Sequence, residues 1–221
     1  RVWISSFEEE RDRPALGYIY GEKYRLAVDA GHSKLHVEEF YALLKEKGLP
    51  LPDFTVLTHW HWDHTFGMPW INGSSLAEER TQAHLLKILS GWGEDSRGKF
   101  MEMDEHIALE YADQDMHVVG ADIVFKEEIG IDLGKIRVQC FHVESPHTED
   151  SVLVLLPEEK ILFFGDCISG KYPDWIVDRD LMKALILALQ KLDFTIAIGG
   201  HWNIFKKEEL LAMLKEENGL D

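Results

Sequence analysis

The chain has 221 residues, 45% of them hydrophobic and 29% charged, which is the composition of a globular protein with a substantial core. Its formal net charge is −17, from 23 basic and 40 acidic side chains. A field of this sign repels phosphate backbones and argues against nucleic acid as a partner. A local basic groove would weaken that argument, and the charge also serves solubility.

The number of cysteines and the hydropathy of the chain indicate the cellular compartment in which the protein is expected. Two cysteines, Cys140 and Cys167, are too few for a disulfide framework and favour a reducing environment. No signal sequence is evident, and no apolar run approaches the about 20 residues of a membrane span. We therefore expect a cytoplasmic protein that contacts no membrane. The missing initiator Met leaves a removed signal as the alternative.

The first quarter of the chain is predicted to consist of strands around one helix. The strands cover 2–5, 16–20, 24–29 and 54–58. Ser33 is placed to cap a helix over 34–47, which Gly48 ends. A polar, histidine-rich stretch follows the last of these strands directly.

The middle of the chain is less regular. Trp70-Ile71 is predicted as a short strand and 76–90 as a helix that Gly91 ends. The stretch 91–121 combines several glycines with many acids. We interpret it as an insertion or lid beside the functional site, with a solvated helix and loop as the alternative.

The second half again favours strands. Strands are predicted over 122–128, 135–143, 151–156, 160–165 and 195–199, and helices over about 178–192 and 206–217. Both halves follow a similar order of strands, a helix and a strand. We expect one domain over 1–221, with two sheets facing each other and helices outside.

Three imidazoles and a carboxylate lie within six residues after the strand 54–58. The stretch is Thr58-His59-Trp60-His61-Trp62-Asp63-His64. Neutral imidazole nitrogens and carboxylate oxygens are the ligands that Zn²⁺ and similar cations prefer. The sequence therefore predicts a metal site here, against the alternatives of a His-rich surface loop or adventitious affinity.

Three further candidates follow other predicted strands. His147, Asp166 and His201 each stand where a strand gives way to a loop beside turn-forming residues. A single histidine after a strand is more often a hydrogen-bonded turn residue, and a single Asp is often a cap. Together with the first cluster, these residues favour one shared metal site.

The order His59-x-His61-x-Asp63-His64, then His147, Asp166 and His201, resembles the metallo-β-lactamase superfamily of metallohydrolases. Asp29-Ala30-Gly31 is similar to that superfamily's first motif, and the resemblance runs from about residue 15 to 202. It implies an α/β fold of the α+β type, a four-layer αββα sandwich with the metals at one edge between the sheets.

The resemblance also implies a division of the ligands. His59, His61 and His147 would hold one metal, Asp63, His64 and His201 would hold a second, and Asp166 would bridge them. This set is similar to that of dinuclear hydrolases such as glyoxalase II. Ser145-Pro146-His147-Thr148 lacks the family's usual glycine. No equivalent of glyoxalase II's separate helical domain is evident, which weakens the expectation of a glutathione thioester substrate.

These features predict a metal-dependent hydrolase acting on a small ester, thioester, lactone or amide. Two divalent ions, expected to be Zn²⁺ with Mn²⁺ or Fe²⁺ as alternatives, would share a bridging hydroxide. Asp63 would orient it and shuttle a proton. The rival functions are a phosphodiesterase on the same site, an iron-dependent oxidoreductase and a non-catalytic metal-binding module. The oligomeric state is not indicated.

Several neighbouring residues have more than one interpretation. Asp29 and Thr58 would orient the ligands, or act only as structural caps. Lys171 and Tyr172 would contact a carboxylate or oxyanion of the substrate, with a solvated loop cation as the alternative for Lys171. Cys167 would be a ligand only if its loop shifted by one residue. Trp60 and Trp62 are expected in the core, with one of them forming a wall of the pocket as the alternative. The remaining histidines are expected to be structural or surface residues: His32, His36, His84, His106, His117 and His142.

Overall fold

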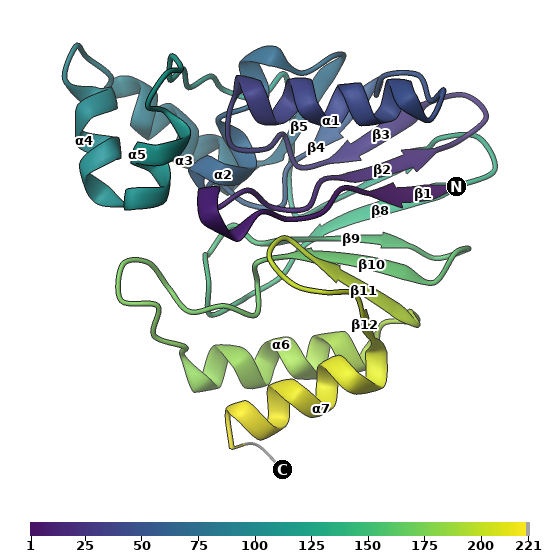
Figure 1. Ribbon diagram of the computed structural model, residues 1–221. Helices are drawn as coiled ribbons and strands as arrows, with labels where there is room; N and C mark the ends of the chain where they lie inside the picture. The colour runs from purple at the N-terminus through teal and green to yellow at the C-terminus, as the bar shows by residue number, and fades with distance from the viewer. Residues whose placement is uncertain (220–221) are drawn as a thin grey trace.

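Two six-stranded sheets face each other in the computed structural model, which describes residues 1–219 (Figure 1). The first sheet contains, in spatial order, β1 (Val2–Ile4), β2 (Gly17–Tyr20), β3 (Arg25–Val28), β4 (Phe54–Val56), β5 (Ser74–Glu78) and β6 (Ile123–Phe125). β1, β2 and β3 are antiparallel neighbours, whereas β3 to β6 run parallel. Parallel neighbours end at the same edge of a sheet, so loops that follow them gather there.

The second sheet is formed by the last six strands of the chain. It contains β12 (Phe205–Lys206), β11 (Ile196–Gly199), β10 (Ile161–Gly165), β9 (Val152–Leu156), β8 (Arg137–His142) and β7 (Glu128–Asp132). β10 and β11 are parallel, and the other neighbours are antiparallel. The loops after β10 and β11 therefore also leave the sheet at one edge.

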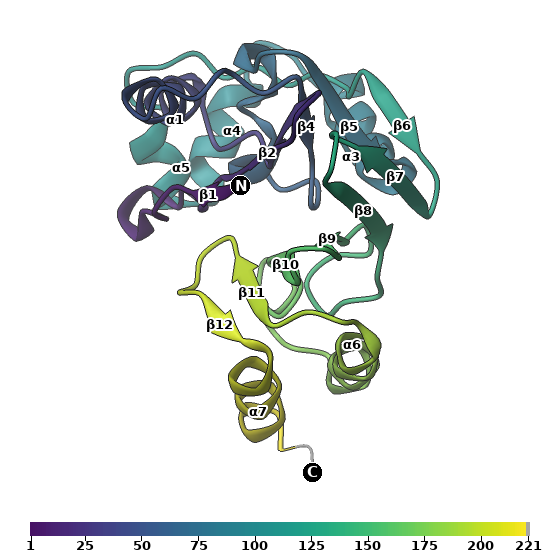
Figure 2. The same cartoon turned by 90° about the vertical axis from the view of Figure 1, so that its right-hand side faces the viewer.

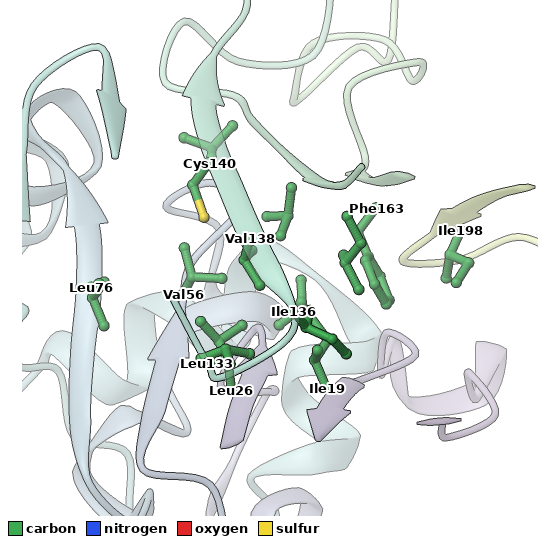
Figure 3. Close-up of a cluster of buried hydrophobic side chains, with 14 of the residues drawn as sticks. Ile19, Leu26, Val56, Leu76, Leu133, Ile136, Val138, Cys140, Phe163 and Ile198 are labelled. Atoms are coloured by element: carbon green, nitrogen blue, oxygen red, sulfur yellow. The ribbon is translucent and has the colours of Figure 1, made fainter. Parts of the chain in front are cut away.

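The main core lies between the sheets, where alternate side chains of each strand point inward (Figure 3). In β9, Val152 and Val154 belong to this core, and the intervening Leu153 belongs to the cluster under the outer helices. Burial on both faces explains why β9 is apolar at every position. Leu26 and Val56 supply the facing side chains from the first sheet.

Helices cover the outer face of each sheet (Figures 1 and 2). On the first sheet, α1 (Lys34–Glu46) packs Phe40 and Leu44 against Tyr18 and is capped by Ser33, as predicted. On the second sheet, α6 (Arg179–Lys191) and α7 (Lys207–Glu217) form the opposite layer. The predicted four-layer αββα arrangement is confirmed.

Three sequence-based boundaries were wrong. Residues 74–78 form β5, so the helix α3 (Glu79–Ser90) begins three residues later than predicted. β5 pairs with parallel strands on both sides, and tertiary pairing overrides its helical propensity. Trp70-Ile71 is not a strand, because Met68–Trp70 form a 3₁₀ turn, η2. The predicted strand 122–128 is split, because the chain passes from β6 in one sheet to β7 in the other.

The stretch 91–121 contains two short helices, α4 (Ser96–Met103) and α5 (Glu105–Glu110), beside the short helix α2 (Trp62–Thr65) of the histidine cluster. Phe100 of α4 packs edge-to-face on Phe66. A second 3₁₀ turn, η1 (Glu9–Arg11), lies against α5. Whether the stretch acts as a lid stays a prediction. Among residues 1–219, none of the helices has the length and apolar character needed to span a bilayer.

Candidate metal centre

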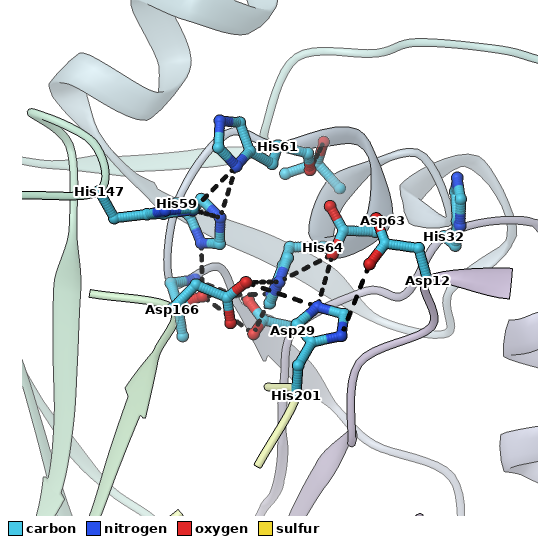
Figure 4. A network of polar contacts seen from close by, with 12 residues as sticks. Asp12, Asp29, His32, His59, His61, Asp63, His64, His147, Asp166 and His201 are labelled. Carbon is cyan, nitrogen blue, oxygen red and sulfur yellow. Dashed lines mark hydrogen bonds and ion pairs between the residues drawn. The ribbon is translucent and has the colours of Figure 1, made fainter. Parts of the chain in front are cut away.

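Every predicted ligand lies at one edge of the two sheets (Figure 4). The histidine cluster follows β4 of the first sheet, and His147 lies on the loop between β8 and β9 of the second. Asp166 and His201 follow β10 and β11, the parallel pair. The topology therefore brings together residues that are up to 142 positions apart, from His59 to His201.

His59, His61 and His147 form the first ligand set. Nε2 of His147 lies 3.2 Å from Nε2 of His59 and 2.9 Å from Nδ1 of His61, and the last two nitrogens are 3.1 Å apart. Three nitrogens thus converge on one point. Two imidazole ligands of a tetrahedral zinc ion stand about 3.4 Å apart, close to this spacing.

The first set is buried, and burial disfavours the charged form of its rings. It lowers the pKa of His61 to about 3, and it lowers the pKa values of His59 and His147 as well. The neighbouring imidazoles add to this effect at His59 and His61. All three rings are neutral at pH 7, which is the form that ligates metals.

The second set mixes two acids with two histidines. Nε2 of His64 and Nε2 of His201 lie 3.0 Å and 2.9 Å from Oδ2 of Asp63. Both nitrogens are 3.4 Å from Oδ2 of Asp166. The predicted residues are therefore assembled, and Asp166 groups with the second set rather than with the three histidines. Its bridging role stays a prediction.

The electrostatics of the second set are opposite to those of the first. Burial alone would lower the pKa of His201, but Asp166 and Asp63 outweigh it and raise that pKa to about 9. The pKa of His64 is also raised, by Asp63 and Asp29 against the effect of burial. In return, the positive rings hold the pKa of Asp63 well below its usual range although burial opposes this.

Neighbouring groups fix which ring nitrogen faces the site. Asp29 accepts hydrogen bonds from the Thr58 backbone N–H at 2.7 Å and hydroxyl at 2.9 Å, and its Oδ2 lies 2.8 Å from Nδ1 of His64. Nδ1 of His147 lies 2.8 Å from the carbonyl oxygen of Gly170. These partners leave Nε2 of both histidines directed into the site. Asp29 itself adopts a left-handed backbone (φ 65°), a strained conformation that occurs at functional sites.

Two glycines allow the backbone to approach the ligands. Gly165 has φ +51°, and a Cβ there would lie 2.6 Å from Oγ1 of Thr58. A Cβ at Gly200 would lie 2.4 Å from Oδ1 of Asp166. Only glycine fits both positions without moving a ligand or its support.

Ligand-type atoms suit two divalent cations. Each set offers at least three donor atoms within 4.8 Å of one another. Oδ1 of Asp166 is buried and makes no hydrogen bond with any of residues 1–219. A buried polar atom without a partner is costly, and a bound cation would satisfy it. The residues therefore fit the metals that the sequence predicts.

A small pocket of about 130 Å³ opens beside the first set. Its walls include His61, His147, Lys171 and Tyr172. That Lys171 and Tyr172 contact a substrate stays a prediction. Trp175 stacks on the ring of His147, with centroids 6.0 Å apart and planes at 13°.

The sequence missed three residues near the site. Asp12 lies 3.7 Å from Nδ1 of His201, and burial and Asp63 raise its pKa to about 7. Nothing in its sequence context indicated this position. His84 lines the pocket, so its assignment as a structural or surface residue was incomplete. Trp175 was detectable only through its proximity in sequence to Lys171 and Tyr172.

The structure also shows where Cys167, the two tryptophans of the histidine cluster and His32 lie. The Cys167 thiol is buried in the apolar cluster under α6 and belongs to neither ligand set, so its alternative role as a ligand was wrong. Trp62 is buried in the core as expected, whereas Trp60 is partly exposed and lines the pocket. His32 is buried with its ring edge-to-face against Tyr111.

Sequence comparisons identify related proteins. A model of the family described as the metallo-beta-lactamase superfamily matches residues 16–201. The chain is 26% identical over 186 residues to an atrochrysone carboxyl ACP thioesterase of Aspergillus fumigatus, covering 83% of this chain and 49% of that protein. It is 23% identical over 188 residues to a beta-lactamase-like protein 2 homolog of Caenorhabditis elegans, covering 83% and 54%. The chain thus spans about half the length of the curated relatives it matches.

Solved structures share the fold at low sequence identity. A metallo-beta-lactamase superfamily protein of Sulfolobus tokodaii has a TM-score of 0.68 and 20% identity, over 97% of this chain and 85% of that one. A metallo-beta-lactamase from Pontibacter korlensis has a TM-score of 0.66 and 21% identity, over 97% and 95%. At this identity the likeness establishes the fold only.

Proposed function

Because the chain belongs to the metallo-beta-lactamase superfamily, we propose that it is a hydrolase with a dinuclear metal centre, acting on an acyl ester or thioester. One observation carries the proposal. Three neutral imidazoles converge directly beside a second set of two acids and two histidines, at one edge of the sheets. The relative named as an ACP thioesterase supports an acyl thioester among the small esters, thioesters, lactones and amides.

Each ligand has a proposed place. His59, His61 and His147 would hold one ion, and Asp63, His64 and His201 would hold the second. Asp166, whose Oδ1 lacks a partner among residues 1–219, would contact both. Divalent ions held here would supply a water of lowered pKa and polarise the acyl oxygen. Zn²⁺ suits imidazole and carboxylate ligands, with Mn²⁺ and Fe²⁺ as alternatives.

The protein's own groups would position the reactants and move the proton. Hydrolysis forms a bond from the water oxygen to the acyl carbon and breaks the bond to the leaving oxygen or sulfur. Asp63, ionised at neutral pH, would accept a proton of the water and return it to the leaving group. Asp29 would hold the His64 ring, and Lys171 and Tyr172 would contact the substrate in the pocket.

Metal analysis joined to substrate screening tests the proposal. Protein expressed with ample metal should carry close to two equivalents of Zn, Mn or Fe and hydrolyse acetyl esters or thioesters. The same panel should contain a lactone, a β-lactam and a phosphodiester. Metal near zero would refute the ligand assignment. Turnover of the phosphodiester alone would favour the rival phosphodiesterase, and redox activity with iron but no hydrolysis would favour an oxidoreductase.

A further inference from the structure

A second, larger groove lies along α3 and α4, next to the pocket of the metal centre. It has a volume of about 490 Å³. Most of its lining is apolar and aromatic: Trp60, Ile88, Trp92, Phe100 and Met103. Met103 is 41% exposed, and the side chains around it are partly buried. Such a surface gains free energy when an apolar group covers it.

The groove connects to the metal centre through shared walls. Trp60 and His84 line both the groove and the pocket that contains His61 and His147. Their rings are stacked, with centroids 5.2 Å apart and planes at 19°. A flexible chain whose reactive end reaches the metal ligands can therefore continue over Trp60 into the groove.

The charge of the groove is opposite to that of the protein. Its lining contains Lys87 and Lys99 but no Asp or Glu, although the chain has 40 acids and 23 basic residues. Within residues 1–219, neither lysine forms a salt bridge. Two free cations at an apolar surface complement an anion attached to an apolar chain.

We propose that the substrate is an amphipathic acyl ester or thioester with an anionic group remote from its scissile carbonyl. The carbonyl lies at the metal centre, the apolar acyl chain follows Trp60 into the groove, and the anion lies between Lys87 and Lys99. This inference rests on the proposed hydrolase function for its reaction. The groove itself, however, is testable without turnover.

Binding to metal-free protein tests the groove alone. Decanoate and decanol are titrated into protein treated with a chelator, and binding is measured by calorimetry and by tryptophan fluorescence. Decanoate should bind at least about tenfold more tightly than decanol. The double change Lys87→Gln and Lys99→Gln should remove that preference, whereas Lys183→Gln with Lys191→Gln, on exposed positions of α6, should preserve it. Equal binding of the two probes, or equal loss in both variants, would overturn the proposal.

Turnover tests whether the groove serves catalysis. The substrates are an acetyl thioester, a decanoyl thioester with a terminal carboxylate, and the same decanoyl thioester with that carboxylate as its methyl ester. Met103→Glu places an acid in the groove, and Leu109→Glu is its matched control, since both side chains are 41% exposed and only Met103 lines the groove. Met103→Glu should raise KM for the carboxylate substrate about tenfold, whereas Leu109→Glu should leave that KM unchanged. An unchanged KM in Met103→Glu would contradict the inference.

The two proposals fail in different ways. If the protein hydrolyses the acetyl thioester but binds decanoate no more tightly than decanol, the proposal for the groove fails and the proposed hydrolase function stands. If the protein binds decanoate preferentially but hydrolyses no ester or thioester, the proposed hydrolase function fails and the groove remains a binding site. Light scattering tests whether a second copy of the chain occupies the groove. If the wild type is a dimer that dissociates in Met103→Glu but not in Leu109→Glu, the groove is a dimer interface and the proposal is overturned.

Discussion

The pKa values of neighbouring histidines at this site are shifted in opposite directions. His59 and His61 have lowered pKa values, because they are buried and face other imidazoles. His64 and His201 have raised pKa values, because carboxylates outweigh the effect of the same burial. The two ligand sets therefore differ in the number of protons that they hold before metal binds.

This difference predicts stepwise proton release. At pH 7 the first ion should enter the three neutral histidines without releasing protons. The second should displace up to about two, from His64 and His201. Its affinity should rise with pH at least until the pKa of His201, about 9, is passed, because the pKa of His64 is also raised. Calorimetry in two buffers of unequal ionisation enthalpy measures the release, and equal release for both ions would contradict the assignment.

Asp63 is expected to be the proton carrier. Asp63→Asn should lower kcat for an acetyl ester by about a hundredfold or more, because the amide cannot accept the proton of the attacking water. Circular dichroism should show an intact fold. Asp113→Asn, a change at an exposed carboxylate, is the control and should keep full activity. Unchanged turnover in Asp63→Asn would remove this residue from the mechanism.

At the scale of elements, a buried ion pair attaches α5 to the segment between η1 and β2. Arg13 donates two hydrogen bonds of 2.9 Å to the Glu110 carboxylate, which is 1% exposed and also accepts the Ser33 hydroxyl. Ser33 is the cap of α1. Three segments that are distant in sequence thus meet at the Glu110 carboxylate, near the loop that places Asp12 beside His201.

Glu110→Gln should lower the free energy of unfolding by about 2 kcal/mol at pH 7, because Arg13 loses its hydrogen bonds to a buried carboxylate charge and keeps only the more exposed Glu8 and Glu39 as ion-pair partners. Arg13 and Ser33 hold the pKa of Glu110 below its ordinary 4.5, although burial opposes this. The stabilisation is therefore full above pH 4.5 and is lost as pH falls through the lower, folded-state pKa.

Urea unfolding of metal-free protein at pH 7 and at acid pH measures this effect. The difference between wild type and Glu110→Gln should shrink on acidification. Glu10→Gln, at an exposed acid of η1, should unfold like wild type at pH 7. A difference that is constant with pH would show that the stabilisation does not depend on ionised Glu110.

At the scale of the molecule, the metal centre joins the two sheets. His59, His61, Asp63 and His64 follow a strand of the first sheet, whereas His147, Asp166 and His201 follow strands of the second. Each proposed ion takes ligands from both. A metal bound only by the folded chain stabilises it by mass action and should resist separation of the sheets.

Metal loading should therefore raise the free energy of unfolding by about 2.7 kcal/mol for each ion at a free concentration of about 100 Kd. Thermal and urea unfolding with and without chelator measure the gain. His147→Ala should lose most of the contribution of the first ion and retain that of the second, whereas His106→Ala, outside both sets, should keep both. Equal stability of loaded and chelated wild type would contradict a centre that spans the sheets.

Much of the site was predictable because its ligand types are chemically unusual at strand ends. The stretch from His59 to His64 indicated a metal by itself, and positions after predicted strands indicated His147, Asp166 and His201. The resemblance to a family added the division of these ligands between two metals. Local sequence also determined helix α1, since Ser33 and the apolar spacing act within a few residues. These features depend on neighbouring residues and on side-chain chemistry.

Only the tertiary structure decided the rest. Strand β5 forms because partners exist on both sides, and the switch between β6 and β7 depends on which sheet each segment meets. Asp12 approaches His201 from 189 residues away in sequence, so no local pattern marks it. The groove with Lys87 and Lys99 exists because side chains of α3 and α4 line one hollow together with Trp60. Long-range proximity sets burial, charge and pairing, and a single sequence does not contain those distances.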